Sequence, residues 1–195
     1  MNNREIILKK IIYPILMAFA FAIIGWLWEG IYEFLKMGFI ANHGVLLGPW
    51  LPIYGAGGLI IYLLLNRYHN NPLVVFMGSF VFCTIIEYAT GWWLETYKGR
   101  KWWSYVEMPF NIDGRICLLA SIFFGIGGLF VIYIAAPKLK KFFDRFNIKK
   151  LAIITLLLVA ILVLDFIHST DHPNIPKKHQ IIDVKNMPEF KLFKK

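Results

Sequence analysis

ICLLASIFFGIGGLFVIYIAAP, residues 116–137, is the stretch of sequence that decides the fold, because none of its side chains is charged. The hydrocarbon core of a bilayer is about 30 Å thick, and a helix needs about 20 apolar residues to cross it. Backbone N–H and C=O groups find no water in that core, so they must hydrogen-bond within the segment. The stretch therefore predicts a transmembrane α-helix.

Four further stretches meet or approach the same length. One of them is free of charge, and two others hold a single acid within their apolar part, Glu87 and Asp165. Together with the first stretch they predict five transmembrane helices, over about 11–35, 44–65, 73–95, 116–137 and 151–167. We therefore expect an all-α polytopic membrane protein, with a transmembrane domain over residues 1–168 and a polar extramembrane tail over 169–195.

The composition excludes several other classes of protein. Of the 195 residues, 58% are hydrophobic and only 17% are charged, which is too apolar for a disordered chain or an ordinary soluble domain. The net charge is +9, but the basic residues lie between apolar runs rather than on one solvated face, so we expect no nucleic-acid partner. Cys83 and Cys117 both lie in apolar stretches, which indicates neither a disulfide framework nor a cysteine-based zinc site.

The Lys and Arg residues of the loops predict the orientation in the membrane. With the N-terminus in the cytoplasm, the cytoplasmic segments up to residue 150 hold 10 Lys and Arg residues, and the opposite loops hold 5. The six lysines of the tail would then face outward and nearly cancel this bias. We expect a multi-pass protein of the cell membrane with its N-terminus in the cytoplasm.

The first four predicted helices contain an internal repeat. Gly25-Trp-Leu-Trp-Glu29 is echoed 66 residues later by Gly91-Trp-Trp-Leu-Glu95, and Gly55-Ala-Gly-Gly58 is echoed 70 residues later by Gly125-Ile-Gly-Gly128. Between them, Asn42-His-Gly44 is echoed at Asn111–Gly114. Because Gly and Trp are common in membrane helices, chance is the alternative explanation. The pattern predicts that helices 1–2 and 3–4 form a parallel repeat, with helix 5 outside it.

Acidic side chains gather toward one end of the first and third predicted helices. Glu87, Gly91 and Glu95 are spaced by four residues and lie on one helical stripe, and Gly25 and Glu29 repeat this spacing. A charged residue in a membrane helix costs about 2.5–3.5 kcal/mol on insertion scales, so it usually faces the bundle interior and has a partner. The stripe predicts partners for these acids inside the bundle.

Arg115, at the start of the fourth predicted helix, is the nearby arginine that suits a bidentate pair with one of these acids. The functional interpretation is a substrate or proton site built from Glu87, Glu29 and Arg115. The structural alternative is an ion pair between helices, with Glu29 and Glu95 simply at the membrane interface.

The segment from Gly44 to Gly58 holds Pro49, Pro52 and five glycines. Proline removes a hydrogen-bond donor and disfavours helix at the residue before it. This predicts a bent segment, or one that begins as an irregular re-entrant stretch lining a cavity. Close helix packing through small residues is the alternative.

Two other clusters have simpler explanations. Six of the seven tryptophans lie on one side of the membrane, where an interfacial aromatic belt explains most of them and a cage for a cationic or sugar-like ligand is a weaker alternative. Asp165, His168, Asp171 and His172 gather where the fifth helix ends. Their spacing makes His168 and His172 weak metal candidates, but a solvated helix end is the simpler interpretation, so we expect no metal and no cofactor.

The chain resembles the putative ABC-transporter type IV family, also called CmpB-like, over roughly residues 15–140. The resemblance rests on these motifs: Gly25-Trp-Leu-Trp-Glu29; Asn42-His-Gly with Gly48-Pro-Trp-Leu-Pro-Ile-Tyr-Gly55; Glu87-Tyr88 with Gly91 and Glu95; Trp102-Trp103-x-Tyr105; and Asn111-x-x-Gly-Arg-Ile-Cys-Leu118. This sequence departs from the family pattern at His43, Ser104 and Phe124. The resemblance implies a permease.

Our first hypothesis is a permease-like subunit that binds a small solute in a cavity between the repeats. The chain has no Gly-x-x-x-x-Gly-Lys-Ser/Thr loop, so an ATPase would be a separate subunit, docked on 138–150, and we do not expect this chain to be an enzyme. The alternatives are a membrane enzyme acting on lipid or envelope precursors, and an accessory membrane scaffold. The candidate substrate-binding residues are Glu29, Asn42, Tyr54, Glu87, Glu95, Trp103, Asn111 and Arg115.

Overall fold

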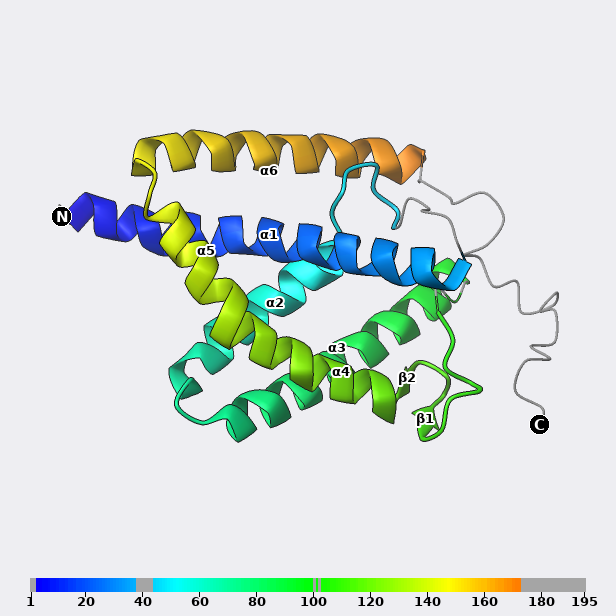
Figure 1. Ribbon diagram of the computed structural model, residues 1–195. Helices are drawn as coiled ribbons and strands as arrows, with labels where there is room; N and C mark the ends of the chain where they lie inside the picture. Colours follow the sequence, from blue (N-terminus) through cyan, green and yellow to red (C-terminus); the bar gives the residue numbers. More distant parts are fainter. Residues whose placement is uncertain (1–2, 38–43, 100, 102, 173–195) are drawn as a thin grey trace.

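The computed structural model describes residues 3–37, 44–99, 101 and 103–172 (Figure 1). Its elements, in chain order, are α1 (Asn3–Met37), α2 (Pro52–Leu65), the short 3-10 helix η1 (Asn66–Tyr68), α3 (Pro72–Lys98), the strands β1 (Asn111–Ile112) and β2 (Ile116–Cys117), α4 (Leu118–Phe130), the π-helical turn η2 (Val131–Ala135), α5 (Ala136–Phe143) and α6 (Ile148–Asp171). The expected all-α architecture is confirmed, apart from a two-residue antiparallel ladder between β1 and β2.

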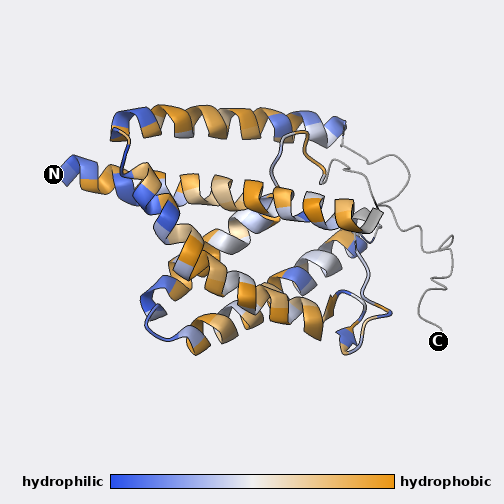
Figure 2. Ribbon diagram, viewed as in Figure 1, coloured by the Kyte–Doolittle hydropathy of each residue, from blue (hydrophilic) through white to orange (hydrophobic). Residues whose placement is uncertain are grey.

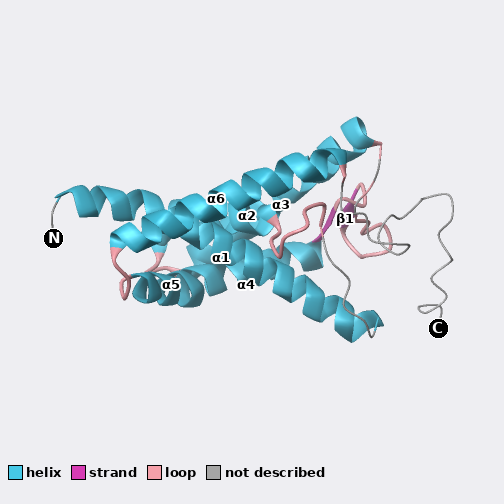
Figure 3. Cartoon of the chain, turned by 90° about the horizontal axis from the view of Figure 1, so that it is seen from above, coloured by secondary structure: helices cyan, strands magenta, loops and turns pink. Residues whose placement is uncertain are grey.

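The chain passes back and forth between two ends of the molecule (Figure 1). One end, which we call the basic end, holds the start of α1, the turn at 66–71 and the connection at 144–147. The other end, the loop end, holds residues 44–51 and the loop at 99–117. Figure 3 shows the β1 region and the N-terminus at opposite ends as well. Beside this arrangement, α6 packs along α1.

Four helical segments are long and apolar enough to cross a membrane: Asn3–Tyr32, Pro72–Tyr97, Leu118–Phe143 and Ile148–Asp171. Figure 2 shows that hydrophobic residues cover most of their length, while hydrophilic residues concentrate toward the ends of the molecule. The chain is therefore a multi-pass membrane protein. The last helix extends to Asp171, three residues beyond the boundary that the sequence predicts for the transmembrane domain.

The predicted span over 44–65 is not one continuous helix. Residues 44–51 are irregular, and α2 starts only at Pro52, where proline suits the first helical turn because its missing N–H needs no partner there. At 1.5 Å per residue, the 14 residues of α2 extend about 21 Å, which is short of a bilayer core. The expectation of five spanning helices is therefore replaced by four long helices and one short helix with an irregular lead.

Both helical pairs pack through closely spaced glycines. A Cβ at Gly55 would meet the backbone of Ala18 on α1, and a Cβ at Gly125 would meet the ring of Phe76 on α3. One turn further on, Gly58 lies against Phe21 and Gly128 against Ser79. These glycines let the helices of each pair approach closely, as small residues do in membrane proteins.

The positions of these contacts define a register between α1 and α3. Phe76 lies 58 positions after Ala18, and Ser79 lies 58 positions after Phe21. The Gly-Trp-Glu motifs of the sequence are 66 positions apart, which is about two helical turns more. Counted by the offset of 58, the position that corresponds to Glu29 is Glu87, whereas the motif offset of 66 gives Glu95.

The helices α4 and α5 are continuous through η2. The π-helical turn spans Val131–Ala135, and α5 follows with Pro137 in its first turn. Three residues of η2, Val131, Ile132 and Ala135, are buried in the main hydrophobic core together with side chains of α1, α2, α3, α5 and α6. The π turn thus lies where most of the helices meet.

At the basic end, Asp144 ties α1 to the end of α5. The Asp144 carboxylate accepts hydrogen bonds from Lys9 Nζ at 2.7 Å and from the Tyr13 hydroxyl at 2.8 Å, and the rings of Tyr13 and Phe143 make an edge-on contact. The hydrogen bonds from Lys9 and then Tyr13 lower the pKa of Asp144 below its ordinary value of 3.8.

We expect Asp144→Asn to lower the free energy of unfolding at neutral pH by no more than about 1 kcal/mol, because the ion pair is partly exposed. A lowered native pKa means that this contribution is present above pH 3.8 and is lost as pH falls through the native pKa. The stabilities of wild type and variant, measured by thermal unfolding in detergent, should therefore converge on acidification. A constant difference down to pH 2 would contradict this role.

Candidate functional site

The first half of the candidate site joins α1 to α2 through Glu29 and Tyr54. The Tyr54 hydroxyl donates a hydrogen bond of 2.8 Å to Glu29 Oε1. The Tyr54 ring lies directly on Gly25, where a Cβ would overlap it, so the glycine one turn before Glu29 makes room for the ring. The spacing of Gly25 and Glu29 therefore positions a tyrosine beside the carboxylate.

The second half joins α3 to the loop at 99–117 through Glu87 and Tyr105. The Tyr105 hydroxyl donates a hydrogen bond of 3.0 Å to Glu87 Oε1. Burial, and then the charge of Glu87, raise the pKa of Tyr105, so its hydroxyl keeps the proton that it donates. The other carboxylate oxygen, Glu87 Oε2, is buried and has no hydrogen-bond partner among the residues that the structure describes.

The acid of each pair acts electrostatically on the tyrosine of the other pair. Tyr54 is within electrostatic range of both Tyr105 and Glu87, and Tyr105 is within range of Glu29. We call Glu29, Tyr54, Glu87 and Tyr105 the Glu–Tyr cluster. It brings together side chains from both helical pairs, and the two acids correspond by the offset of 58.

Glu95 and Arg115 belong to a separate network nearer the loop end. Arg115 donates from Nε at 3.0 Å and from Nη2 at 2.8 Å to one carboxylate oxygen of Glu95, and from Nη1 to Asp113 and Tyr88. Lys101 lies 3.3 Å from the other oxygen of Glu95. Arg115 thus pairs with Glu95 and Asp113 among the described acids, and not with Glu87. This favours the ion-pair interpretation for Glu95 and Arg115.

Asn111 and Trp103 shape the loop at 99–117. The Asn111 side chain accepts from the N–H of Gly114 and donates to the carbonyls of Met108 and Val106, which holds the turn between β1 and β2. Trp103 Nε1 donates to the Arg115 carbonyl at 2.9 Å. Both residues position backbone rather than line the cluster. Asn42 lies outside the described residues.

Asp165 has a role that the sequence did not indicate. Its two carboxylate oxygens accept hydrogen bonds from the N–H groups of Leu47 and Gly48, from Trp50 Nε1 at 2.9 Å and from the Ser169 hydroxyl. A buried carboxylate on α6 thereby holds the irregular segment 44–51. The only signal in the sequence was an acid within an apolar run.

The histidines near Asp165 do not form a metal site in the described part of the chain. The rings of His168 and His172 stack with their centres 5.2 Å apart, and no group of three or more potential ligands there comes together. His168 and His172 are one helical turn apart. This spacing, which made them candidate metal ligands, lets their rings stack on each other.

Two open hollows on the described surface lie away from the Glu–Tyr cluster. One, of about 400 Å³, is on α5 beside Lys138 and Phe142, and the other, of about 580 Å³, lies over α2 and α3 beside Leu64 and Met77. Neither is lined by a residue of the cluster. The tyrosine hydroxyls occupy one oxygen of each acid, so a solute reaching these oxygens would displace them.

Sequence reasoning identified three of the four cluster residues as candidates and missed Tyr105. The tyrosine is part of the Trp102-Trp103-x-Tyr105 motif, which was the available signal. Its distance from Glu87 depends on how the loop folds back: the Tyr105 N–H donates to the Gly114 carbonyl at 2.8 Å. Nothing in the spacing from 87 to 105 indicates that contact.

The comparisons with known proteins give one match. A family model described as putative ABC-transporter type IV matches residues 16–170, which include all four residues of the Glu–Tyr cluster. No curated protein and no solved structure matches the chain.

Proposed function

We propose a function from one premise: the chain belongs to the putative ABC-transporter type IV family, and it is a membrane protein related to ABC transporters. The proposal is that the chain is a permease-like subunit that binds a small cationic solute at the Glu–Tyr cluster. ATP would be hydrolysed by a separate subunit, because this sequence has no phosphate-binding loop of the Gly-x-x-x-x-Gly-Lys-Ser/Thr type.

The observation that supports this proposal most directly is Glu87 Oε2. A buried polar atom without a hydrogen-bond partner costs about 1–3 kcal/mol, and more when it is charged. Among the described residues this oxygen has no donor, although Oε1 of the same side chain has Tyr105. Membrane proteins retain such acids mainly where a substrate, an ion or a proton binds.

The charges around the cluster favour a cation. The cluster itself consists of two acids and two tyrosines, and the cations Arg115 and Lys101 of the neighbouring loop pair with Glu95. Each acid carries a negative charge when ionised, and a positive solute group bound between the two pairs would be attracted to both. The aromatic faces of Tyr54 and Tyr105 also suit a cation.

The cluster lies nearer the loop end than the basic end of the molecule, since Glu29 lies in the last third of α1. The ten Lys and Arg residues of the basic end and its connections favour the cytoplasm for that end. We therefore propose that the N-terminus is cytoplasmic and that the solute reaches the cluster from the opposite side of the cell membrane.

The experiment that tests the proposal is a thermal-shift screen of the full chain in mild detergent with small amines, quaternary ammonium compounds and metal cations. A solute that binds the folded state raises the melting temperature. We expect Glu87→Gln to weaken binding of the stabilising solute by about 30-fold or more, since losing one member of a buried charge pair costs about 2–5 kcal/mol.

The matched control is Glu107→Gln, which removes the same charge from an exposed position of the loop at 99–117. It should keep the affinity of wild type. The proposal is wrong if Glu87→Gln responds as strongly as wild type, or if only anionic and neutral solutes stabilise the wild-type chain. Turnover of a lipid precursor by the purified chain alone would point to an enzyme instead.

A further inference from the structure

The amphipathic end of the α4–α5 helix presents a row of cations at the basic end of the molecule. Lys138, Lys141 and Arg145 follow one another at steps of three and four residues, so they lie along one side of the helix and the turn after it. All three side chains are exposed. We call them the basic row.

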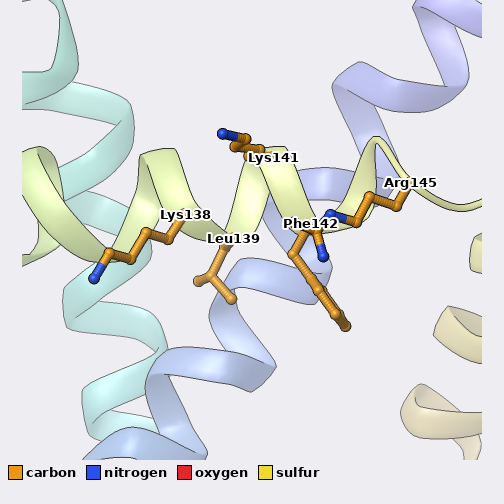
Figure 4. Close-up of a pocket in the computed structure, with 5 residues that line it drawn as sticks. All are labelled: Lys138, Leu139, Lys141, Phe142 and Arg145. Atoms are coloured by element: carbon orange, nitrogen blue, oxygen red, sulfur yellow. The ribbon is translucent and has the colours of Figure 1, made fainter.

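The basic row borders the hollow on α5. Leu139 and Phe142 line this hollow with the three cations, and its volume is about 400 Å³ (Figure 4). In Figure 4 the cationic groups spread along the helix instead of meeting at one point, while Leu139 and Phe142 point to the same side. This arrangement suits an extended layer of anions above an apolar layer better than a single small anion.

The cations of the row have no acidic partner in the described part of the chain. Asp144, the acid between Lys141 and Arg145, is paired with Lys9 at 2.7 Å. The ion pairs between described residues otherwise involve Glu95 and Asp113, at the loop end. The positive charge of the row is therefore available to a ligand.

The apolar neighbours of the row indicate which ligand it fits. Phe142 is 50% exposed and Phe146 is 43% exposed, and their rings contact each other with centres 5.1 Å apart. The membrane-spanning segment ends at Phe143, so these rings lie where hydrocarbon gives way to headgroups. Long basic side chains at that depth extend to the phosphate layer.

From this geometry we propose that the basic row is a binding site for anionic phospholipid headgroups, with Leu139 and Phe142 against the upper acyl chain. Phosphates of neighbouring lipid headgroups would take their hydrogen bonds from Lys138, Lys141 and Arg145. A soluble acidic subunit would leave the two exposed phenylalanines facing water, so the apolar component favours lipid over that partner. The site is independent of the Glu–Tyr cluster.

The test uses the purified full-length chain in mild detergent, titrated with phosphatidylglycerol or phosphatidylcholine, with bound lipid counted by native mass spectrometry. We expect wild type to retain phosphatidylglycerol preferentially. The variant with Lys138→Gln, Lys141→Gln and Arg145→Gln should bind it on the order of 100-fold more weakly, since each basic residue near anionic lipid contributes about 1 kcal/mol, or about fivefold.

The control variant removes the same charge from the basic end outside the row, by Lys10→Gln, Lys149→Gln and Lys150→Gln, which are all exposed. It should change retention by less than about threefold. Equal losses in the two variants would overturn the proposal, because diffuse charge would then suffice. Equal retention of phosphatidylcholine by wild type would also overturn it.

Two further arms distinguish other occupants of the row. Displacement of phosphatidylglycerol by millimolar inorganic phosphate would show that the row is a site for a free anion. An acidic protein bound there in place of lipid would show that it is a protein interface. Either result would overturn the proposal. If the triple variant does not reach the membrane, Arg145→Gln alone is measured in the same way. Its expected loss is about fivefold, and undiminished retention would count against the site.

Discussion

Replacing Asp165 by alanine should lower the free energy of unfolding by about 3 kcal/mol or more, since a buried donor left without a partner costs about 1–3 kcal/mol and more than one such donor is affected. Four donors lose their acceptor together: the N–H groups of Leu47 and Gly48, the Trp50 indole and the Ser169 hydroxyl. Thermal unfolding in detergent measures the loss. The effect should be local as well as global, because this carboxylate accepts the hydrogen bonds that join the segment 44–51 to α6, beside the packing of Leu158 and Leu162.

A labelling experiment separates the local effect from general instability. Leu46 is only 6% exposed, so a cysteine introduced as Leu46→Cys should react slowly with a maleimide in an otherwise wild-type chain. Adding Asp165→Asn should accelerate the reaction well below the melting temperature. The control is Asp171→Asn, an exposed acid on the same helix, which should change neither stability nor labelling. Similar labelling in all three chains would show that Asp165 does not hold the segment.

The second large effect is expected at Gly128, where α4 packs against Ser79 of α3. A methyl group there would overlap the Ser79 side chain, which is fully buried. Gly128→Ala should therefore force the helices apart and cost about 1–3 kcal/mol, the usual range for overpacking a core. Thermal unfolding and retention of the folded monomer in detergent measure this cost.

The neighbouring Gly127 provides the matched control, because a Cβ there meets nothing within 4 Å. Gly127→Ala should be neutral or raise stability by up to about 1 kcal/mol, as expected for replacing glycine within a helix. Combining Gly128→Ala with Ser79→Gly should restore part of the lost stability, since the overlapping atoms are removed from the facing helix. Equal effects of the two alanine variants would mean that the close approach of α3 and α4 is not important.

The sequence predicted the long helices well because hydrophobic length is a direct consequence of bilayer thickness. The sequence overestimated the helical length of the second span, over residues 44–65, because of two prolines. Residues 44–65 are apolar throughout, but Pro49 and Pro52 prevent a regular helix before residue 52, and hydrophobicity alone does not register that. The alternative of an irregular lead, which the same prolines suggested, describes 44–51 correctly.

The candidate site was predicted less completely, because contacts between distant residues decide it. Glu29, Tyr54 and Glu87 were identified from their own stretches of sequence. The sequence did not show which acid of α3 corresponds to Glu29. The matching motifs give Glu95, whereas the offset of the helix contacts gives Glu87. Hydrogen bonds across 18 residues to Tyr105 and across 117 residues from Gly48 to Asp165 likewise depend on tertiary structure, which no local pattern encodes.

The π turn η2 allows one helix to serve two different neighbours. A π turn accommodates an extra residue, which rotates everything after it by about 100° relative to a regular α-helix. Before the turn, Gly125 and Gly128 face α3; after it, Ala136 and Phe143 face the core that includes α1. The extra residue therefore changes which side of the helix faces each neighbour. It also determines the direction in which Lys138, Lys141 and Arg145 project, although the π turn itself lies within the membrane-spanning segment.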